Sequence, residues 1–310
     1  MAEVTCVKTP FNQAVVEKCP SLKAGFRPLF GFRSKEAQAF LARVLPVDRM
    51  RYAREIFAFA DGVESSLDWK YCAPARVRAD PIVVCLPERG GDSGSKHVMR
   101  FTDHCRSAGF TTVVFNRRGH ADGSLLPKTG AIAGAACVFP RHADDLSDLA
   151  SAVDHVCKRY PNPRKYLVGF DDLAIDYLAH VGDDSPFFAA ASVGADVRVD
   201  ALKRLLRKRT DECTLIAEGR LGPIDLKKAR NATSVAEFDG CFGGGGGVEK
   251  GDVRSVKRPL LCVQSAMDAL CNPLVVHVET RVAGGWIDSL FGTPWYMRLV
   301  VEFLSATASF

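Results

Sequence analysis

The segment GFDDLA at 169–174 is similar to the motif G-x-S-x-G, which turns a strand sharply into a helix and exposes a nucleophilic serine. Asp171 stands where the motif has serine, and Leu173 replaces its closing glycine. An aspartate can itself attack a substrate and form an ester intermediate, which a histidine resolves by activating water. The segment therefore fits either an aspartyl nucleophile or a corner that has lost its chemistry.

Apolar runs and helical periodicities alternate on both sides of this corner. Continuous apolar runs predict buried strands at 81–87, 111–116, 165–170, 187–193, 258–264 and 273–279. Helical spacing predicts helices at 96–108, 143–160, 172–181 and 293–306, the last with Thr293 as N-cap and Pro294 at N1. The alternation predicts an α/β fold with a mostly parallel central sheet, preceded by a hairpin at 55–71.

The net charge and the cysteines indicate which partners and which cellular compartment to expect. A net charge of +5 over 310 residues is too weak to indicate a nucleic-acid partner. The 11 cysteines form no C-x-x-C pair, and Cys85 and Cys262 fall in apolar runs, so we expect buried free thiols, no metal and no cofactor. We place the chain in a reducing intracellular compartment, cytoplasm or mitochondrion. No apolar stretch is long enough to predict a transmembrane segment.

Several longer strings resemble one family in order and spacing. They are EKCPSLKAGFRP, DGVESSLDW, VVFNRRGHADGSLLP, DDLSDLASAVDHVCKRYPN, SVAEFDGCF and NPLVVHVETRVAGGW. The chain resembles the esterase/lipase-like family of the α/β-hydrolase superfamily that includes the plant embryogenesis-associated protein. With this resemblance we expect an N-terminal arm at 1–50 and an α/β-hydrolase-like domain at 51–310, with a reduced cap insertion at about 199–250.

The resemblance implies a Ser–His–Asp triad, whose other two positions we can locate. Asp268, in SAMDAL, occupies the position of the acid. The histidine position falls on Gly285 or Trp286, and neither residue can move a proton. The last of the seven histidines, His277, lies inside a predicted strand. His120, in a loop after a strand, is left as a candidate for a displaced base.

The loop that should help form the oxyanion hole is also altered. It reads LPERGGDSGSKH, with Glu88 and Arg89 where the family has an apolar, glycine-rich turn, and Asp172 directly follows Asp171. Carboxylates at this place are expected to repel a developing oxyanion. We therefore predict that the chain is not an enzyme. It would be a pseudoenzyme with degenerate triad positions at Asp171, Asp268 and Trp286, and would act as a structural or scaffold subunit of a larger protein assembly.

Two alternatives remain open. One is an active hydrolase of esters or related small substrates, with Asp171 as nucleophile and a displaced histidine base. The other is a small-molecule sensor that retains the pocket without the triad. Separately, a basic helix face predicts either a solvated surface or a contact with an acidic protein, RNA or anionic lipid. Its residues are Lys203, Arg204, Arg207 and Lys208.

Overall fold

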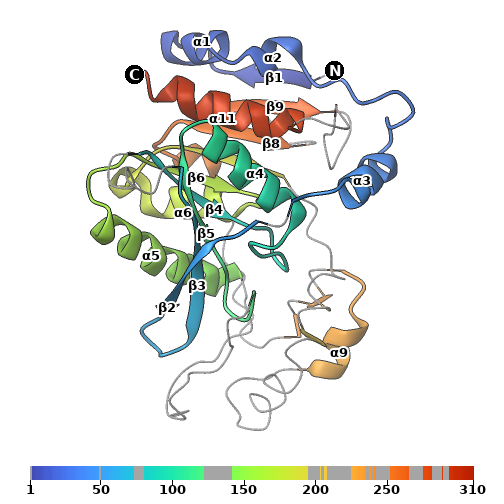
Figure 1. Ribbon diagram of the computed structural model, residues 1–310, viewed down its shortest axis with the longest axis vertical. Coiled ribbons are helices and arrows are strands. Elements are labelled where there is room, and N and C mark those ends of the chain that lie inside the picture. Colours follow the sequence, from blue (N-terminus) through green and yellow to red (C-terminus); the bar gives the residue numbers. More distant parts are fainter. Residues whose placement is uncertain are drawn as a thin grey trace.

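The computed structural model describes residues 2–48, 50–72, 80–121, 142–194, 203, 206–207, 225–234, 237–238, 240–241, 252–264, 275–280, 288 and 293–310. A nine-stranded sheet runs through these residues in the order β1-β9-β8-β7-β6-β4-β5-β3-β2 (Figure 1). Its strands are β1 (Ala2–Cys6), β2 (Ala53–Ala58), β3 (Glu64–Lys70), β4 (Ile82–Leu86), β5 (Thr111–Phe115), β6 (Lys165–Gly169), β7 (Phe187–Val193), β8 (Leu260–Gln264) and β9 (Val275–Thr280).

The direction of the strands confirms the predicted fold class. The strands from β9 through β8, β7, β6 and β4 to β5 pair in parallel. The β2–β3 hairpin adds to β5 antiparallel, and β1 adds to β9 antiparallel at the other edge. The chain thus has the predicted α/β architecture with a mostly parallel sheet and an N-terminal hairpin.

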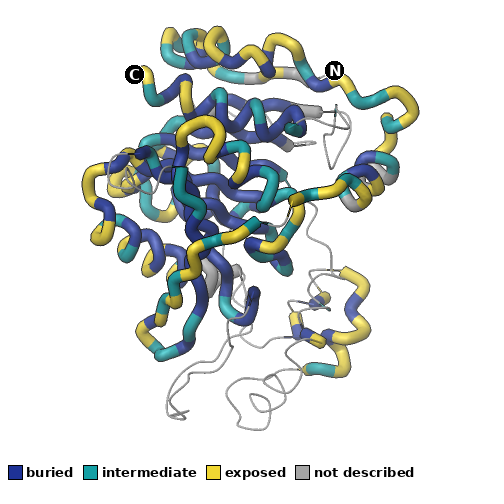
Figure 2. Tube along the Cα trace, viewed as in Figure 1, coloured by how far each residue is buried: buried dark blue, intermediate teal, exposed yellow. Residues whose placement is uncertain are grey.

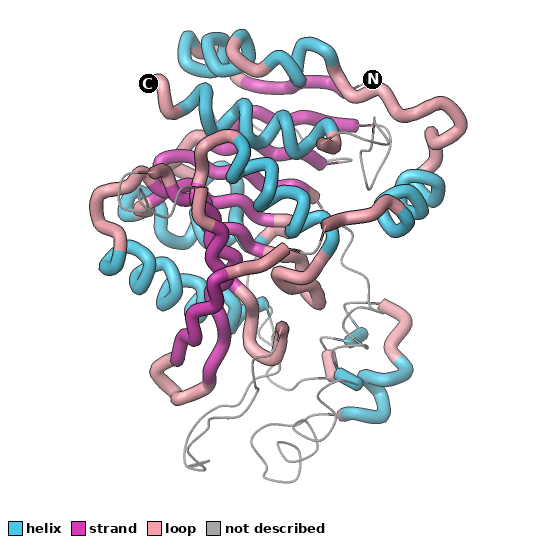
Figure 3. The backbone as a smooth tube through the Cα atoms, in the orientation of Figure 1, coloured by secondary structure: helices cyan, strands magenta, loops and turns pink. Residues whose placement is uncertain are grey.

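Helices cover both faces of the sheet (Figure 3). The helices are α1 (Pro10–Glu17), α2 (Pro20–Ala24), α3 (Lys35–Val44), α4 (Lys96–Ser107), α5 (His142–Arg159), α6 (Leu173–Val181), α9 (Leu226–Asn231) and α11 (Trp295–Thr307), with short 3-10 turns η2 (Gly182–Asp184) and η3 (Val253–Ser255). None of the helices in the described part of the chain is long and apolar enough to cross a membrane.

Alternation along the strands divides the core into two layers, and the central strands are buried along most of their length (Figure 2). Val83 and Cys85 of β4 point into the layer that packs against α4 and α11, whereas Ile82 and Val84 point into the layer under α5 and α6. Successive side chains of a strand face opposite sides, so a strand covered on both sides must be apolar throughout. This explains why the central strands appear in the sequence as continuous apolar runs.

The N-terminal residues are attached through α11. The side chain of Glu302 accepts hydrogen bonds from the amide and the hydroxyl of Ser21, both at 2.8 Å. The indole of Trp295 donates to the carbonyl of Ser21 at 2.9 Å. Helix α11 begins one residue later than predicted, because Pro294 has an extended backbone (ψ 144°) and is itself the N-cap in place of Thr293.

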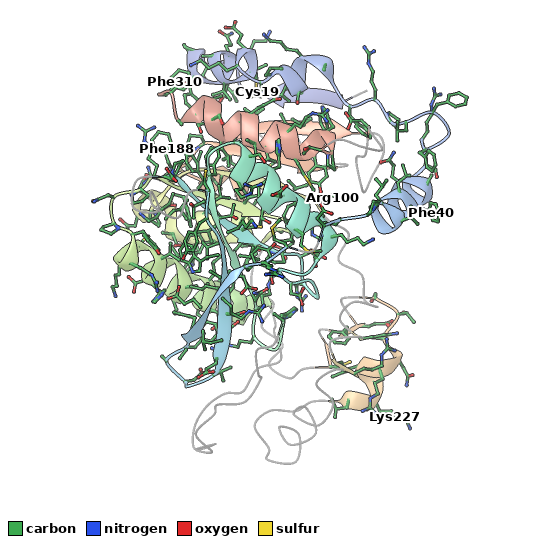
Figure 4. The ribbon with its side chains drawn as sticks, viewed as in Figure 1. Cys19, Phe40, Arg100, Phe188, Lys227 and Phe310 are labelled. Carbon is green, nitrogen blue, oxygen red and sulfur yellow. The ribbon has the colours of Figure 1, made fainter. Side chains whose placement is uncertain are left out.

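Helix α11 supplies a large part of the apolar layer, which gives a direct test of the packing. Phe303 is fully buried, whereas Phe40 of α3 is 57% exposed at the edge of the molecule (Figure 4). We expect Phe303→Ala to lower the free energy of unfolding by about 3–5 kcal/mol, through lost burial and a residual cavity. Phe40→Ala should stay within about 0.5 kcal/mol of the wild type. Equal effects in urea titrations of the two variants would contradict this packing.

Candidate active site at the corner between β6 and α6

The corner that contains Asp171 joins β6 directly to α6. The amide of Phe170 still bonds to the carbonyl of Leu86 at 2.9 Å, so the β4–β6 ladder continues to the residue before the turn. A Cβ on Gly169 would lie 2.8 Å from the Cβ of Ala174, which explains why this position needs glycine. Among the described non-glycine residues a positive φ occurs at Ala121 and not at Asp171, so the corner holds its aspartate without the backbone strain of the serine motif.

Bonds to three separate elements fix Asp171. Its Oδ2 lies 2.6 Å from Nη2 of Arg117, and its Oδ1 accepts a hydrogen bond from the amide of Leu173 at 3.1 Å. Its carbonyl accepts from the hydroxyl of Ser192 on β7 at 3.2 Å. Asp172 is the N-cap of α6 but its side chain makes no capping bond; the carboxylate of Asp171 contacts the first turn instead. The negative charge is thus placed at the positive end of the helix.

Arg117 reaches the corner from the loop after β5. Its guanidinium also donates to the carbonyl of Pro87, directly after β4. Its side chain is 1% exposed and that of Asp171 is 8% exposed, so both charges are removed from water. A charge in such a place is tolerated when it is paired and hydrogen-bonded. The ion pair therefore ties together the carboxyl ends of β4, β5 and β6.

A second polar network holds the loop that follows β4. The carboxylate of Asp68, which is fully buried, accepts from the hydroxyl of Ser93 at 2.5 Å and from the amide group of Asn116 at 2.9 Å. The amide oxygen of Asn116 accepts in turn from the backbone of Ser93 at 2.9 Å. Arg54 pairs with the same carboxylate at 2.7 Å. These bonds fix the loop against β3 and β5, beside the corner.

Basic side chains lie beside two of the acidic groups near the corner. Glu88 Oε2 lies 2.7 Å from His97 Nε2, and Asp171 is paired with Arg117. Burial by itself would raise the pKa of Glu88, but His97 and Arg117 outweigh it and lower that pKa. The charge of Arg117 beside Asp171 and near Glu88 offsets part of the predicted repulsion of a developing oxyanion, whereas the repulsion by Asp172 stays a prediction. The sequence could not show this, since Arg117 is 54 residues away from Asp171.

His120, the predicted displaced base, is fixed in another role. Its Nδ1 lies 2.8 Å from the carbonyl of Arg118, and its Nε2 accepts from the amide of Gly90 at 3.2 Å. The ring is 3% exposed. Burial lowers its pKa to about 4, and the charges of Arg117 and Arg89 act in the same direction. A buried imidazole with both nitrogens engaged connects two loops, and it is poorly placed to move protons.

Several predicted residues lie outside the described part of the chain. These are Asp268, Gly285, Trp286, Arg204 and Lys208. Of the basic face, Lys203 is partly buried and Arg207 is exposed, and its proposed contact stays a prediction. His277 lies in β9, as predicted. The described residues contain no group of three or more His, Cys, Asp or Glu side chains arranged to hold a metal ion.

A cavity of about 560 Å³ lies elsewhere, where α1, α4 and α11 meet. Lys18, His104 and Arg298 line it together with Glu302. Lys18 is held there by the hydroxyl of Ser309 at 2.6 Å and by the ring of Phe310, whose centroid is 4.5 Å away (Figure 4). No residue of the corner lines this cavity, so the candidate site rests on the strand ends.

Known proteins resemble this chain over most of its length. It is 27% identical to Embryogenesis-associated protein EMB8 of Picea glauca, over 94% of this chain and 75% of that protein. It is 24% identical to Phospholipase ABHD3 of Mus musculus, over 87% of this chain and 72% of that protein. Among solved structures, Est1E of Butyrivibrio proteoclasticus with bound ferulic acid superposes with a TM-score of 0.50, at 13% identity, over 83% of this chain and all of that one. No protein-family model matches the sequence.

Fold and relatives together identify the class. The chain has the α/β-hydrolase fold, as the resemblance implied, and is similar over most of its length to these relatives. The prediction that it is not an enzyme is contradicted, because relatives that match 87% of the chain in mouse, cattle and human are phospholipases by name. That prediction rested on a missing histidine and on carboxylates beside the oxyanion position, where the structure places the cation of Arg117 next to Asp171.

The burial of His120 predicts how the stability of the protein depends on pH. Its folded-state pKa of about 4 lies below the usual value of 6.5, so on acidification the unfolded chain takes up a proton before the folded chain does. This contribution to stability is present in full above about pH 6.5 and is lost as the pH falls toward 4. Between pH 7 and pH 5, the free energy of unfolding should fall by about 2 kcal/mol more in the wild type than in His120→Gln.

Urea titrations at the two pH values measure this difference directly. A matched comparison with His155→Gln, which removes a half-exposed histidine, controls for the loss of one titrating ring. Identical pH dependence in the wild type and in His120→Gln would contradict the buried, neutral state of this residue.

Proposed function

We propose that the chain is a hydrolase of carboxylic esters, with Asp171 as the group that attacks the substrate. The observation that carries the proposal is the corner itself, where β6 turns directly into α6 and presents a fixed carboxylate at the carboxyl ends of the parallel strands. Ligands of open α/β sheets bind in the crevice outside these ends. The names of the phospholipase relatives support esters of fatty acids as the first substrates to test.

The contacts of Asp171 position its carboxylate. Arg117 donates to one oxygen of this side chain, and the amide of Leu173 donates to the other. In this mechanism, one oxygen attacks the acyl carbon and the alcohol leaves with a proton from an acid. The acyl group remains on Asp171 as an anhydride, and water then splits it into the free acid and the carboxylate.

Arg117 supports the same step electrostatically. Its buried guanidinium lies 2.6 Å from the attacking group and keeps its positive charge at any working pH. Negative charge that develops on the acyl oxygen beside Asp171 therefore meets a fixed cation in a site of low dielectric. The amides of the first turn of α6 add positive potential at the same corner.

The proposal is tested with p-nitrophenyl esters of increasing acyl length and with phosphatidylcholine vesicles, whose released fatty acid is titrated. Asp171→Asn should lower kcat/KM by about 100-fold or more, because the amide is a poor nucleophile. Asp184→Asn, which changes an exposed aspartate of η2, should leave kcat/KM unchanged. The circular dichroism spectrum of each variant at the assay temperature shows whether it is folded.

Absence of turnover by the folded wild-type protein on every ester would overturn the proposal. Turnover that survives Asp171→Asn unchanged would place the chemistry elsewhere in the chain.

A further inference from the structure

A histidine–glutamate pair lies next to the corner and was not found from the sequence. Glu88 comes from the loop after β4, and His97 from the first turn of α4. Their side-chain atoms Oε2 and Nε2 are 2.7 Å apart. The His97 side chain is 31% exposed, and its Nε2 atom is buried close to Glu88 without a well-directed hydrogen bond. An imidazole that lies beside a carboxylate and is partly exposed can serve as a general base.

The ring of His97 packs on the corner. It meets the ring of Phe170 edge-on, with centroids 4.8 Å apart and planes at 81°. Phe170 is the residue immediately before Asp171, and its own ring is buried among the α4 and α11 side chains. The imidazole therefore contacts the side chain of the residue that precedes Asp171.

The loop is shaped to admit Glu88. A Cβ on Gly91 would lie 2.5 Å from Oε1 and 2.6 Å from Cδ of Glu88, so any other residue would displace the carboxylate. The charges of His97 and Arg117 both favour the ionised form of Glu88. Glycine at 91 and the charge of Arg117 thus keep a negative charge beside His97.

A second histidine–glutamate pair, His155 with Glu55, has a similar geometry but lies away from the corner. His155 Nε2 lies 2.8 Å from Glu55 Oε1, with exposures of 36% and 17%, almost as in the first pair. Glu55 also accepts from the indole of Trp69 and from Arg159, so its carboxylate joins α5 to the hairpin. The two pairs are similar in distance and exposure, but His155 hydrogen-bonds Glu55 and contacts Phe57 of β2, whereas His97 contacts Phe170 at the corner.

We propose that His97, oriented by Glu88, is the acid–base residue of this site. The inference rests on the proposed function. The imidazolium gives its proton to the leaving alcohol as Asp171 takes the acyl group. The neutral ring then accepts a proton from water, whose oxygen attacks the anhydride; this releases the carboxylic acid and restores both the Asp171 carboxylate and the imidazolium.

A p-nitrophenyl ester separates the acylation of Asp171 from the hydrolysis of the anhydride. Nitrophenolate leaves without a proton, so acylation of Asp171 does not need His97 with this substrate. His97→Gln should still release about one equivalent of nitrophenolate per protein in a burst, followed by a steady-state rate about 100-fold or more below the wild type. Acid quench and intact-mass measurement should then find one acyl group on the variant. His155→Gln, the matched pair, should behave as the wild type.

Two variants test Glu88 as a positioning residue and guard against a misfolded His97 variant. Glu88→Gln removes the charge, and Gly91→Ala displaces the carboxylate while His97 stays. Both should lower kcat and move the pH profile of the steady-state rate while KM changes little, whereas a merely structural loop would not move the profile.

The outcomes distinguish this inference from the function on which it rests. A folded His97→Gln protein with a steady-state rate within twofold of the wild type, or unchanged pH profiles in both loop variants, overturns the role of His97 but leaves the hydrolase intact. A wild-type protein without turnover and without a burst removes the proposed function itself.

Discussion

A buried ion pair between Arg117 and Asp171 is the interaction on which the arrangement of this site depends. Both side chains are almost fully removed from water, where an unpaired charge would cost several kcal/mol. The pair therefore has to form in the folded state, and it can form only if the loop after β5 reaches across to the corner after β6. The bond from Arg117 to the carbonyl of Pro87 brings the end of β4 into the same arrangement.

Other contacts between acidic and basic side chains lie in the loops around this pair. Glu88 faces His97, and Arg118 binds both Asp148 of α5 and Asp61 of the hairpin turn. The pairs of Arg118 join segments distant in sequence, so electrostatics helps to hold the loops at the strand ends, whereas apolar packing holds the layers on the faces of the sheet. A site whose acids lie beside cations can accept a substrate that develops negative charge more readily than one whose acids are uncompensated.

Sequence periodicity predicted most of the fold and only part of the site. The parallel strands were visible because both faces are buried, which requires continuous apolar runs, and the position of Asp171 at a strand–helix corner followed from its neighbours. Strand β1 and helices α1 and α2 were not predicted, because their partners β9 and α11 lie at the other end of the chain. The same limit applies to the site. No residue near GFDDLA in the sequence indicates that Arg117 pairs with Asp171. His97 lies in the string LPERGGDSGSKH, where Glu88 was expected to repel an oxyanion and its contact with His97 was not foreseen.

Arg117 and Asp171 stabilise the corner as a pair, and a double-mutant cycle measures this directly. The free energy of unfolding is determined for the wild type, Arg117→Met, Asp171→Asn and the double variant. Each single change should cost about 3–5 kcal/mol by leaving a buried group without its partner. The double change should cost less than their sum by about 2–3 kcal/mol. A coupling energy near zero would show that the two side chains act independently and would contradict the account.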